Sequence, residues 1–300
     1  KQLGKPPHLL QLIDRFRADA VRFGIMVSSP AGNDLLFDES SLEQGRNFNN
    51  KIWNALKLVK MWSERQAPAM AGINADASSA FAINWFENRL AEAREEIERL
   101  MSSFKLSEAL KTIYSLIWDD FCSWYLEWVK PGFEQSIDPA VYQKTIEFFN
   151  DLLQLLHPFM PFITEEIYHL LESRKDDLCV KQVGAIGEPD KEILQSGSLL
   201  KDFITGLRDA RNKNQLKPRD PVRLYVQTAS GQVYGSIQSI LVRQTNASEI
   251  SFTKEAIPQS IAVVIGKEKF YLLTEQPVNT KNQKDQLLKE VEYLRCFLLS

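Results

Sequence analysis

The sequence holds few of the residues that build disulfide frameworks or metal centres. Among its 300 residues there are three cysteines and three histidines. Cys122, Cys179 and Cys296 are odd in number and widely spaced, with no Cys-x-x-Cys pair and no histidine at metal-ligand spacing. A disulfide framework or a zinc site is therefore not expected, and a reducing cytoplasm fits this cysteine content. We predict that the chain binds no metal ion.

Long apolar runs and a strong charge imbalance are also missing. No stretch is apolar over a length that spans a bilayer, and no signal peptide is recognisable. A net charge of −3 gives no global sign of nucleic-acid binding, so any basic surface must be local. What is present, 44% apolar and 25% charged residues, is typical of a globular protein large enough for two domains. The chain also lacks an initiator methionine, and we expect it to be a fragment.

The stretch from Gly45 to Trp62 is predicted to be the helix around which the chain is organised. One stripe at helical spacing is apolar, which is the signature of a helix packed on a core. Its members are Phe48, Ile52, Ala55, Leu56, Val59 and Trp62. A second row, at steps of four, three, four and three, is cationic and polar with an indole in its middle. This row, called the polar line below, consists of Arg46, Asn50, Trp53, Lys57 and Lys60.

The polar line predicts an RNA-binding surface. Positive charge for phosphates and an aromatic plane for a base are what contact with single-stranded RNA requires. The same pattern also fits a solvated helix face with one half-buried tryptophan, and the residues alone leave both interpretations open. The segment from Asp38 to Ser41 is predicted to supply the N-cap of this helix.

Apolar periodicity predicts further helices on both sides of this one. They span about residues 9–23, 78–101, 107–129, 139–156 and 164–171, with Thr164 as the N-cap of the last. The pair Asp119-Asp120 is expected to serve interhelical pairing, because neighbours on a helix point about 100° apart and do not form a two-carboxylate dyad. His157 is expected to be a structural residue in a turn.

Beyond residue 197 the periodicity changes to that of a small α+β module. Helices are predicted at 199–215 and 233–242, and strands at 222–227, 250–253, 261–265 and 270–273. Residues 201–223 hold seven Lys or Arg against three Asp, so phosphate contact and an ordinary solvated helix are both open. The last stretch, 280–300, places Leu287, Val291, Leu294 and Leu298 at the spacing of a coiled-coil seam.

Several separated blocks resemble one family, the valyl-tRNA synthetases. G-R-N-F-N-N-K-I-W-N-A at 45–55 looks like the first helix of their anticodon-binding region, and A-D-A-V-R-F-G at 18–24 looks like the segment that leads into it. I-W-D-D-F-C-S-W-Y at 117–125 and L-R-D-A-R-N-K-N-Q-L-K-P-R at 207–219 resemble later elements of the same family. H-P-F-M-P-F-I-T-E-E-I-Y at 157–168 matches a phrase that the isoleucyl, leucyl and methionyl relatives share.

The resemblance implies a mainly α fold, in which an anticodon-binding helical bundle is followed by a small α+β module and the first helix of a truncated coiled-coil arm. The implied domains are 1–40, the end of a catalytic domain with a connecting segment; 41–175, the helical bundle; 176–278, the α+β module; and 279–300, the start of a coiled-coil tRNA-binding arm. Lys1-Gln2-Leu3-Gly4 resembles the tail of the Lys-Met-Ser-Lys-Ser loop, which implies ATP binding by Lys1.

The resemblance also implies a function, namely recognition of the tRNA(Val) anticodon by one part of an ATP-dependent ligase. The full-length form would activate valine with ATP and Mg²⁺ and transfer it to tRNA. The implied tRNA-binding residues are the polar line together with Arg208, Arg211, Lys213, Lys217 and Arg219. No catalytic residue is implied here, so we expect the fragment alone to be inactive and to bind no cofactor. The parent is expected to be a monomeric cytoplasmic protein that binds no membrane.

Two other functions stay open. The chain could be the same region of an isoleucyl-type synthetase, or a helical scaffold that uses its coiled-coil seam to bind protein and needs no RNA. Affinity for RNA that falls steeply with salt would separate RNA binding from the scaffold.

Overall fold

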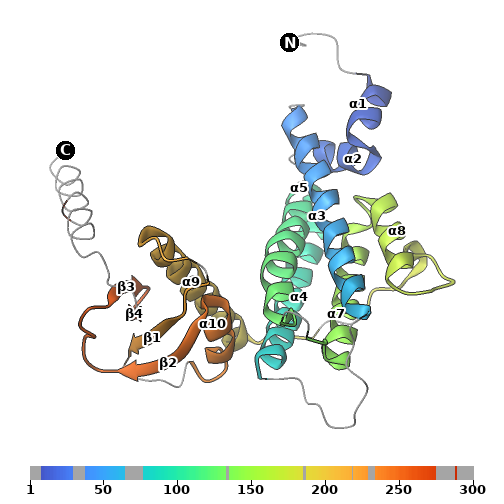
Figure 1. Ribbon diagram of the computed structural model, residues 1–300. Helices are drawn as coiled ribbons and strands as arrows, with labels where there is room; N and C mark the ends of the chain where they lie inside the picture. Colours follow the sequence, from blue (N-terminus) through green and yellow to red (C-terminus); the bar gives the residue numbers. More distant parts are fainter. Residues whose placement is uncertain are drawn as a thin grey trace. The chain divides into compact units, whose positions relative to one another are not determined.

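The computed structural model describes residues 8–29, 38–64, 77–132, 135–184, 187–217, 219–228, 234–274 and 288. The chain divides into two compact units, Lys1–Leu194 and Gln195–Ser300, and each is described by itself. Figure 1 shows helices in the first unit and a small sheet with helices in the second. The predicted helical bundle followed by an α+β module is thereby confirmed. Across the described ranges, no helix is long and apolar enough to cross a membrane.

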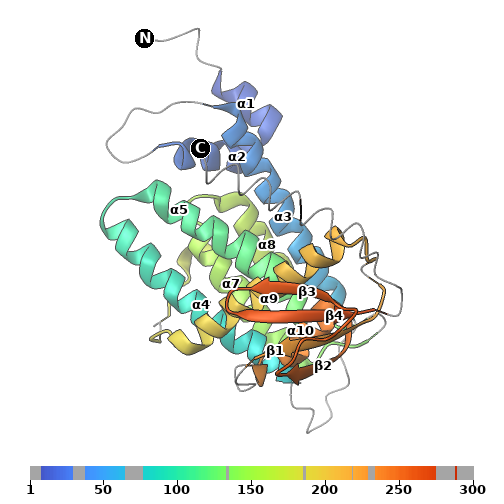
Figure 2. The same ribbon diagram turned by 90° about the vertical axis from the view of Figure 1, so that its left-hand side faces the viewer.

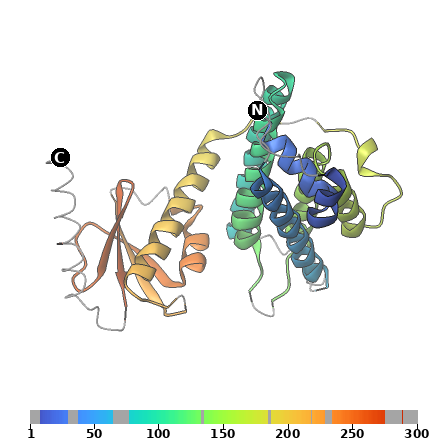
Figure 3. The same ribbon diagram turned by 90° about the horizontal axis from the view of Figure 1, so that it is seen from above.

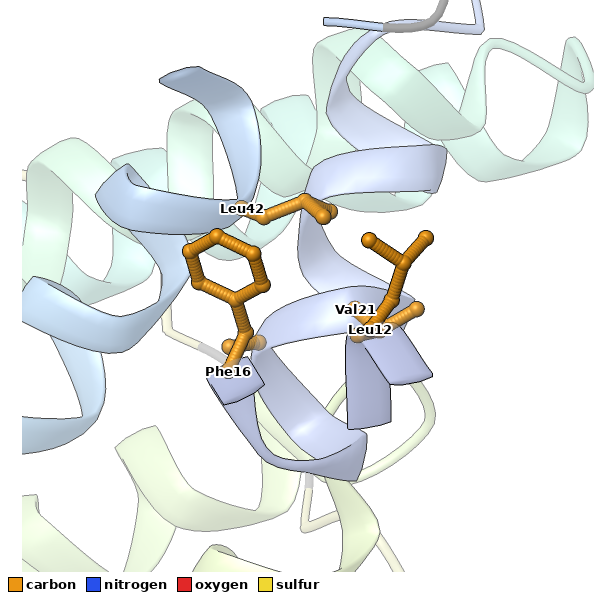
Figure 4. Close-up of a cluster of buried hydrophobic side chains, with 5 residues drawn as sticks. Leu12, Phe16, Val21 and Leu42 are labelled. Atoms are coloured by element: carbon orange, nitrogen blue, oxygen red, sulfur yellow. The ribbon is translucent and has the colours of Figure 1, made fainter. Parts of the chain in front are cut away.

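Two short helices, α1 (Leu9–Phe16) and α2 (Ala18–Val27), begin the first unit. The sequence predicted one helix over 9–23, but the chain breaks at Arg17, whose φ is 80°. Glycine adopts that conformation readily, and other residues rarely do. Because an arginine stands at this position, the sequence gives no sign of the break. The two helices pack on α3 (Glu39–Ser63). Figure 4 shows Leu12, Phe16, Val21 and Leu42 from these three helices in one buried cluster.

The helix α3 matches its prediction closely. The Asp38 carboxylate caps it by accepting from the backbone N–H of Ser40 at 3.0 Å, as predicted for this segment. All six residues of the apolar stripe are buried, at 5% exposure or less. Gly45 extends the stripe, because a Cβ there would lie 2.7 Å from the carbonyl oxygen of Ala20. The glycine therefore permits the close approach of α2 to α3.

A long helical hairpin follows, formed by α4 (Ala77–Ser102) and α5 (Leu106–Ser115), which lie side by side in Figure 2. The predicted helix over 107–129 is found, but it has three parts. After α5 comes a π-helix, η1 (Leu116–Tyr125), and then α6 (Leu126–Val129). A π-helical turn is rare and commonly only one turn long, so ten residues of it could not be read from apolar periodicity.

The pair Asp119-Asp120 serves pairing, as expected. Asp120 is buried at 5% exposure, and its Oδ2 accepts from Nε of Arg89 on α4 at 2.8 Å. Asp119 is exposed and accepts from the Ser115 hydroxyl at 2.8 Å. The two carboxylates therefore face different partners, and they form no acid–base dyad.

The helix α7 (Pro139–Leu156) has its predicted bounds, whereas α8 (Pro161–Leu171) begins three residues before the predicted start. The prediction that Thr164 caps α8 is wrong. Thr164 lies inside the helix, where its hydroxyl donates to the carbonyl of Met160 at 2.8 Å. The acceptor at this helix end is instead Asp19 of α2, which is reached by the N–H of Ile163 at 2.7 Å and of Phe162 at 3.4 Å. His157 bonds to the Thr164 hydroxyl at 2.8 Å, which fits its expected structural role.

The segment after α8 returns along the first unit. A short 3-10 helix, η2 (Leu178–Val180), buries Leu178, whose N–H donates to the Glu165 carboxylate at 2.7 Å. The carbonyl of Gly184 accepts from Arg94 of α4 at 2.7 Å. These contacts hold the connecting segment on α4 and α8.

The second unit carries a four-stranded sheet in the order β2-β1-β4-β3. It is built from α9 (Lys191–Lys213), β1 (Val222–Gln227), α10 (Gln238–Thr245), β2 (Ala247–Thr253), β3 (Ile261–Ile265) and β4 (Glu268–Leu273). Strands β1 and β2 are parallel, so the chain crosses between them through α10, and the other pairs are antiparallel. The helix predicted over 233–242 begins only at Gln238, because 235–237 form a turn.

The core of the second unit lies between the sheet and its helices. In β1, Val222, Leu224 and Val226 are buried, which leaves alternate residues on the other face. The ring of Phe203 on α9 stacks on Tyr234 at 5.6 Å and meets Phe270 of β4 at 4.9 Å, measured between centroids. Figure 3 shows α9 along this face of the sheet. The predicted coiled-coil seam, with Leu287, Val291, Leu294 and Leu298, lies outside the described residues.

Candidate nucleic-acid interface

The polar line runs along one side of α3, away from the buried stripe. Arg46, Asn50, Lys57 and Lys60 are exposed, and Trp53 is half-buried. In the part of the chain that the structure describes, no carboxylate lies within 4.0 Å of the three cationic groups. The Arg46 guanidinium carbon lies 5.8 Å from the ring centre of Phe16, so α1 flanks one end of the line. These cations are therefore available to phosphate groups.

A second cationic and aromatic surface lies on the opposite flank of α3, and the sequence analysis missed it. The ammonium of Lys51 lies 5.2 Å from the ring centre of Trp118 in η1. Trp118 stacks on Tyr114 of α5 with a centroid distance of 5.5 Å and an interplanar angle of 20°. All three side chains are half-buried, and Phe48 of the core supports both rings from 4.8 and 6.4 Å. We call Lys51, Tyr114 and Trp118 the indole platform.

The two surfaces of α3 are distinct. At about 100° per residue, Lys51 lies roughly 160° around the helix from Trp53. Both combine positive charge with an indole, but only the platform has its aromatic side chain already stacked and covered by a cation. Lys51 is 63 or more residues away in sequence from Tyr114 and Trp118, so only tertiary packing brings the lysine to the two rings. The one sequence signal was Trp118 itself, which lies in the 117–125 block.

Cys122 lies in η1 near the indole platform and is not a candidate nucleophile. Burial raises the pKa of the Cys122 thiol to about 12, and the nearby charge of Lys51 lowers it only in part. A thiol with that pKa carries very little thiolate at neutral pH. Nothing at this position suggests catalysis, and the absence of catalytic residues from the chain stays a prediction.

The basic segment of the second unit divides into exposed and buried members. Arg208, Lys213, Lys217 and Arg219 are exposed. Arg211 is only 4% exposed, and its guanidinium donates to the carbonyls of Lys217 and Asp220 at 2.6 Å each and of Thr245 at 3.1 Å. These bonds tie the end of α9 to the chain that returns into β1. Arg211 therefore has a structural role that its neighbours lack.

Two further predictions concern ligands. Lys1, the predicted ATP-binding residue, lies outside the described residues. Within the described ranges, Glu165, His169 and Asp177 bring metal-ligating atoms within 4.8 Å of one another. His169 Nε2 lies 3.2 Å from an oxygen of each carboxylate, so the three groups already contact one another. The absence of a bound metal stays a prediction.

Residues 84–226 match the family described as the anticodon-binding domain of tRNA ligases. The whole chain is similar to valine--tRNA ligases. That of Parabacteroides distasonis is 38% identical over 302 residues, which cover 100% of this chain and 34% of the relative. That of Porphyromonas gingivalis is 38% identical over 304 residues and that of Phocaeicola vulgatus over 302, with the same two shares covered. The chain spans about a third of the length of these relatives.

The match over residues 84–226, which takes in the helical bundle from within α4 onward, places the chain among the anticodon-binding regions of tRNA ligases. More narrowly, the chain belongs to the valine--tRNA ligase family, whose C-terminal third it matches along its full length. The resemblance noted in the sequence is thus confirmed. The comparisons favour neither an isoleucyl-type synthetase nor a protein-binding scaffold.

Proposed function

We propose that the chain recognises the anticodon arm of tRNA(Val) and that α3 carries the contact. The observation behind this proposal is the exposure of the cations of α3 next to two indoles, in the unit whose residues from 84 onward match the anticodon-binding domain. An anticodon loop offers unstacked bases and closely spaced phosphates, so it suits a surface with both aromatic planes and point charges.

The two surfaces of α3 have different tasks in this proposal. The indole platform stacks an anticodon base, because its rings are held in place by Phe48 before RNA arrives. The polar line binds backbone phosphates through Arg46, Lys57 and Lys60, and Asn50 supplies a hydrogen-bonding amide. Phosphate contacts fix position and base contacts carry identity, so the two groups of side chains have different effects on specificity.

The parent of which this region forms part would activate valine with ATP and Mg²⁺ and then transfer it to tRNA(Val). Supporting this is the match to valine--tRNA ligases over the whole chain. The catalytic chemistry, the ATP contact of Lys1, the monomeric state and the cytoplasmic location are likewise proposals for that parent. The present residues contribute binding to the anticodon arm.

A binding titration of the 300-residue chain with a tRNA(Val) transcript at several salt concentrations tests the proposal. Log affinity should fall linearly with log salt. Lys57→Ala and Lys60→Ala should each flatten that slope by about one unit. Lys130→Ala is the matched control, because Lys130 pairs with Glu127 at 3.5 Å on α6. Affinity that is weak and independent of salt would reject RNA binding and favour the scaffold.

A further inference from the structure

The second unit contains a cleft of about 310 Å³ between α9 and α10. It is lined by Arg208, Arg211, Asn212, Leu216, Gln244 and Thr245. Two guanidinium groups and two amides are among these side chains, and no carboxylate is. Clefts for small ligands begin at about 300 Å³, so this one has room for a single charged group with part of the molecule that carries it.

The floor of the cleft is a buried cation. Arg211 is 4% exposed, and among the described residues no carboxylate pairs with it; its acceptors are three neutral carbonyls. Asp220 forms no ion pair with the guanidinium, and its Oδ2 accepts from the backbone N–H of Lys217 at 3.1 Å, but its charge still acts on Arg211. An arginine keeps its charge even where burial lowers its pKa, as it does here. The carbonyl dipoles and the nearby Asp220 compensate that charge in part, and Arg208 adds a second positive charge to the lining of the cleft.

The rim of the cleft adds donors on one face of α9. Arg208 is exposed, and one of its terminal nitrogens donates to Gln244 Oε1 at 2.7 Å, which holds the guanidinium at the mouth. Asn212 follows at i+4, so its exposed amide lies beside Arg208 on the same face. A planar guanidinium with an amide beside it and a fixed cation beneath is suited to the oxygens of a phosphate.

We propose that this cleft binds one phosphodiester of the tRNA backbone, as a contact separate from the anticodon surface of α3. This inference rests on the proposed function. A nucleic-acid phosphate is favoured over a free anion because Lys213, Lys217 and Arg219 continue the positive charge outside the cleft. A single small anion would need no such extension, whereas a backbone follows a positively charged track.

The test uses Arg208→Gln in the 300-residue chain, with Lys191→Gln as the matched control. Lys191 is exposed on the same helix, about 25 Å away along its axis, so the control makes the same charge change at a remote point. Each protein is titrated with the tRNA(Val) transcript across salt concentrations. We expect Arg208→Gln to bind about tenfold more weakly and to flatten the salt slope by about one unit, and the control to match the parent.

Three results would overturn the proposal, and they differ from one another. Equal slopes and affinities for Arg208→Gln and Lys191→Gln would remove the cleft from tRNA binding while leaving the anticodon function intact. If inorganic phosphate alone shifts the Arg208 side-chain N–H signal of the parent in NMR and tRNA affinity is unchanged by Arg208→Gln, the ligand is a free anion. If the parent binds no tRNA, the proposed function fails first.

Far-UV circular dichroism of each variant confirms that the fold is intact.

Discussion

Among the described residues, each unit of the chain buries a charged side chain that binds backbone groups at a helix end, and the two charges have opposite signs. Asp19 in the first unit and Arg211 in the second are both 4% exposed, and both bind backbone groups at a helix end. The Asp19 carboxylate accepts N–H groups at the start of α8, where the helix dipole is positive and Arg22 is close by. Arg211 donates to carbonyls and has no carboxylate partner in the described ranges. The first charge has N–H donors and a cation around it but is penalised by burial, whereas the second lines a cleft that also holds Arg208.

A count of lysines and arginines predicts the net charge of a segment but not where each charge lies. On α3 the buried stripe fixes which side faces solvent, so the cations of the polar line are all exposed as predicted. At the end of α9 the chain must turn into β1, and its carbonyls need donors. Arg211 supplies them, although nothing in the basic segment distinguishes it from Arg208.

The largest expected effect is on the second unit. Arg211→Met removes the donors of three carbonyls, which should lower the free energy of unfolding of this unit by about 3 kcal/mol or more, at about 1–3 kcal/mol for each unsatisfied group. Arg208→Met, at an exposed position, should change it by less than about 0.5 kcal/mol. All six tryptophans lie between Trp53 and Trp128, so their fluorescence reports the first unit, and hydrogen exchange in β1 reports the second. Equal protection of β1 in both variants would contradict the structural role of Arg211.

A smaller effect should separate the two surfaces of α3. Trp118→Leu keeps apolar cover over Phe48 but removes a stacking plane, so tRNA affinity should fall by about 1–3 kcal/mol. Trp118→Phe should restore most of it. Trp53→Leu, in the polar line, should change affinity by less, because Trp53 has no aromatic partner among the described residues. The reverse order, measured by fluorescence anisotropy with labelled tRNA, would move base stacking to the polar line.

The smallest effect concerns Asp19 and pH. Burial raises the pKa of Asp19 above its usual 3.8, against the lowering by hydrogen bonds from Ile163 and Phe162. Because the raised pKa favours the protonated form in the folded state, stability is lost as pH rises from 3.8 through the folded pKa. The slope cannot exceed about 1.4 kcal/mol per pH unit. Asp19→Asn lacks this loss, so its stability relative to the parent should improve over that window in urea unfolding followed by tryptophan fluorescence. A constant difference between the two proteins would show that Asp19 has an ordinary pKa.

Much of the fold could be predicted because local patterns and tertiary structure agree. The stripe of α3, the bounds of α7 and the strands β1 and β3 follow directly from apolar spacing and turn residues. The exceptions have identifiable causes. Arg17 breaks a helix without a glycine, η1 changes the helical period, and α8 is capped by Asp19, 142 residues before its first residue, Pro161. None of these leaves a local signal.

The candidate site likewise has one part that local sequence patterns predict and other parts that they do not. The polar line could be predicted, because it depends only on the period of one helix. The indole platform could not, because it joins Lys51 to Trp118 across two helices. The cleft of the second unit was visible only as a basic segment, since its lining depends on the packing of α9 against α10.

The central claim is that α3 reads the anticodon, and one measurement tests it most directly. The chain is titrated with a tRNA(Val) transcript and with a copy in which only the anticodon is exchanged, at one fixed salt concentration. The account predicts that the exchanged copy binds more weakly by about 1–3 kcal/mol per altered base contact and that Asn50→Ala, which removes the hydrogen-bonding amide of α3, reduces this difference. Equal affinity of the unaltered chain for the two transcripts would contradict the claim, because it would mean that the chain holds tRNA without reading its anticodon.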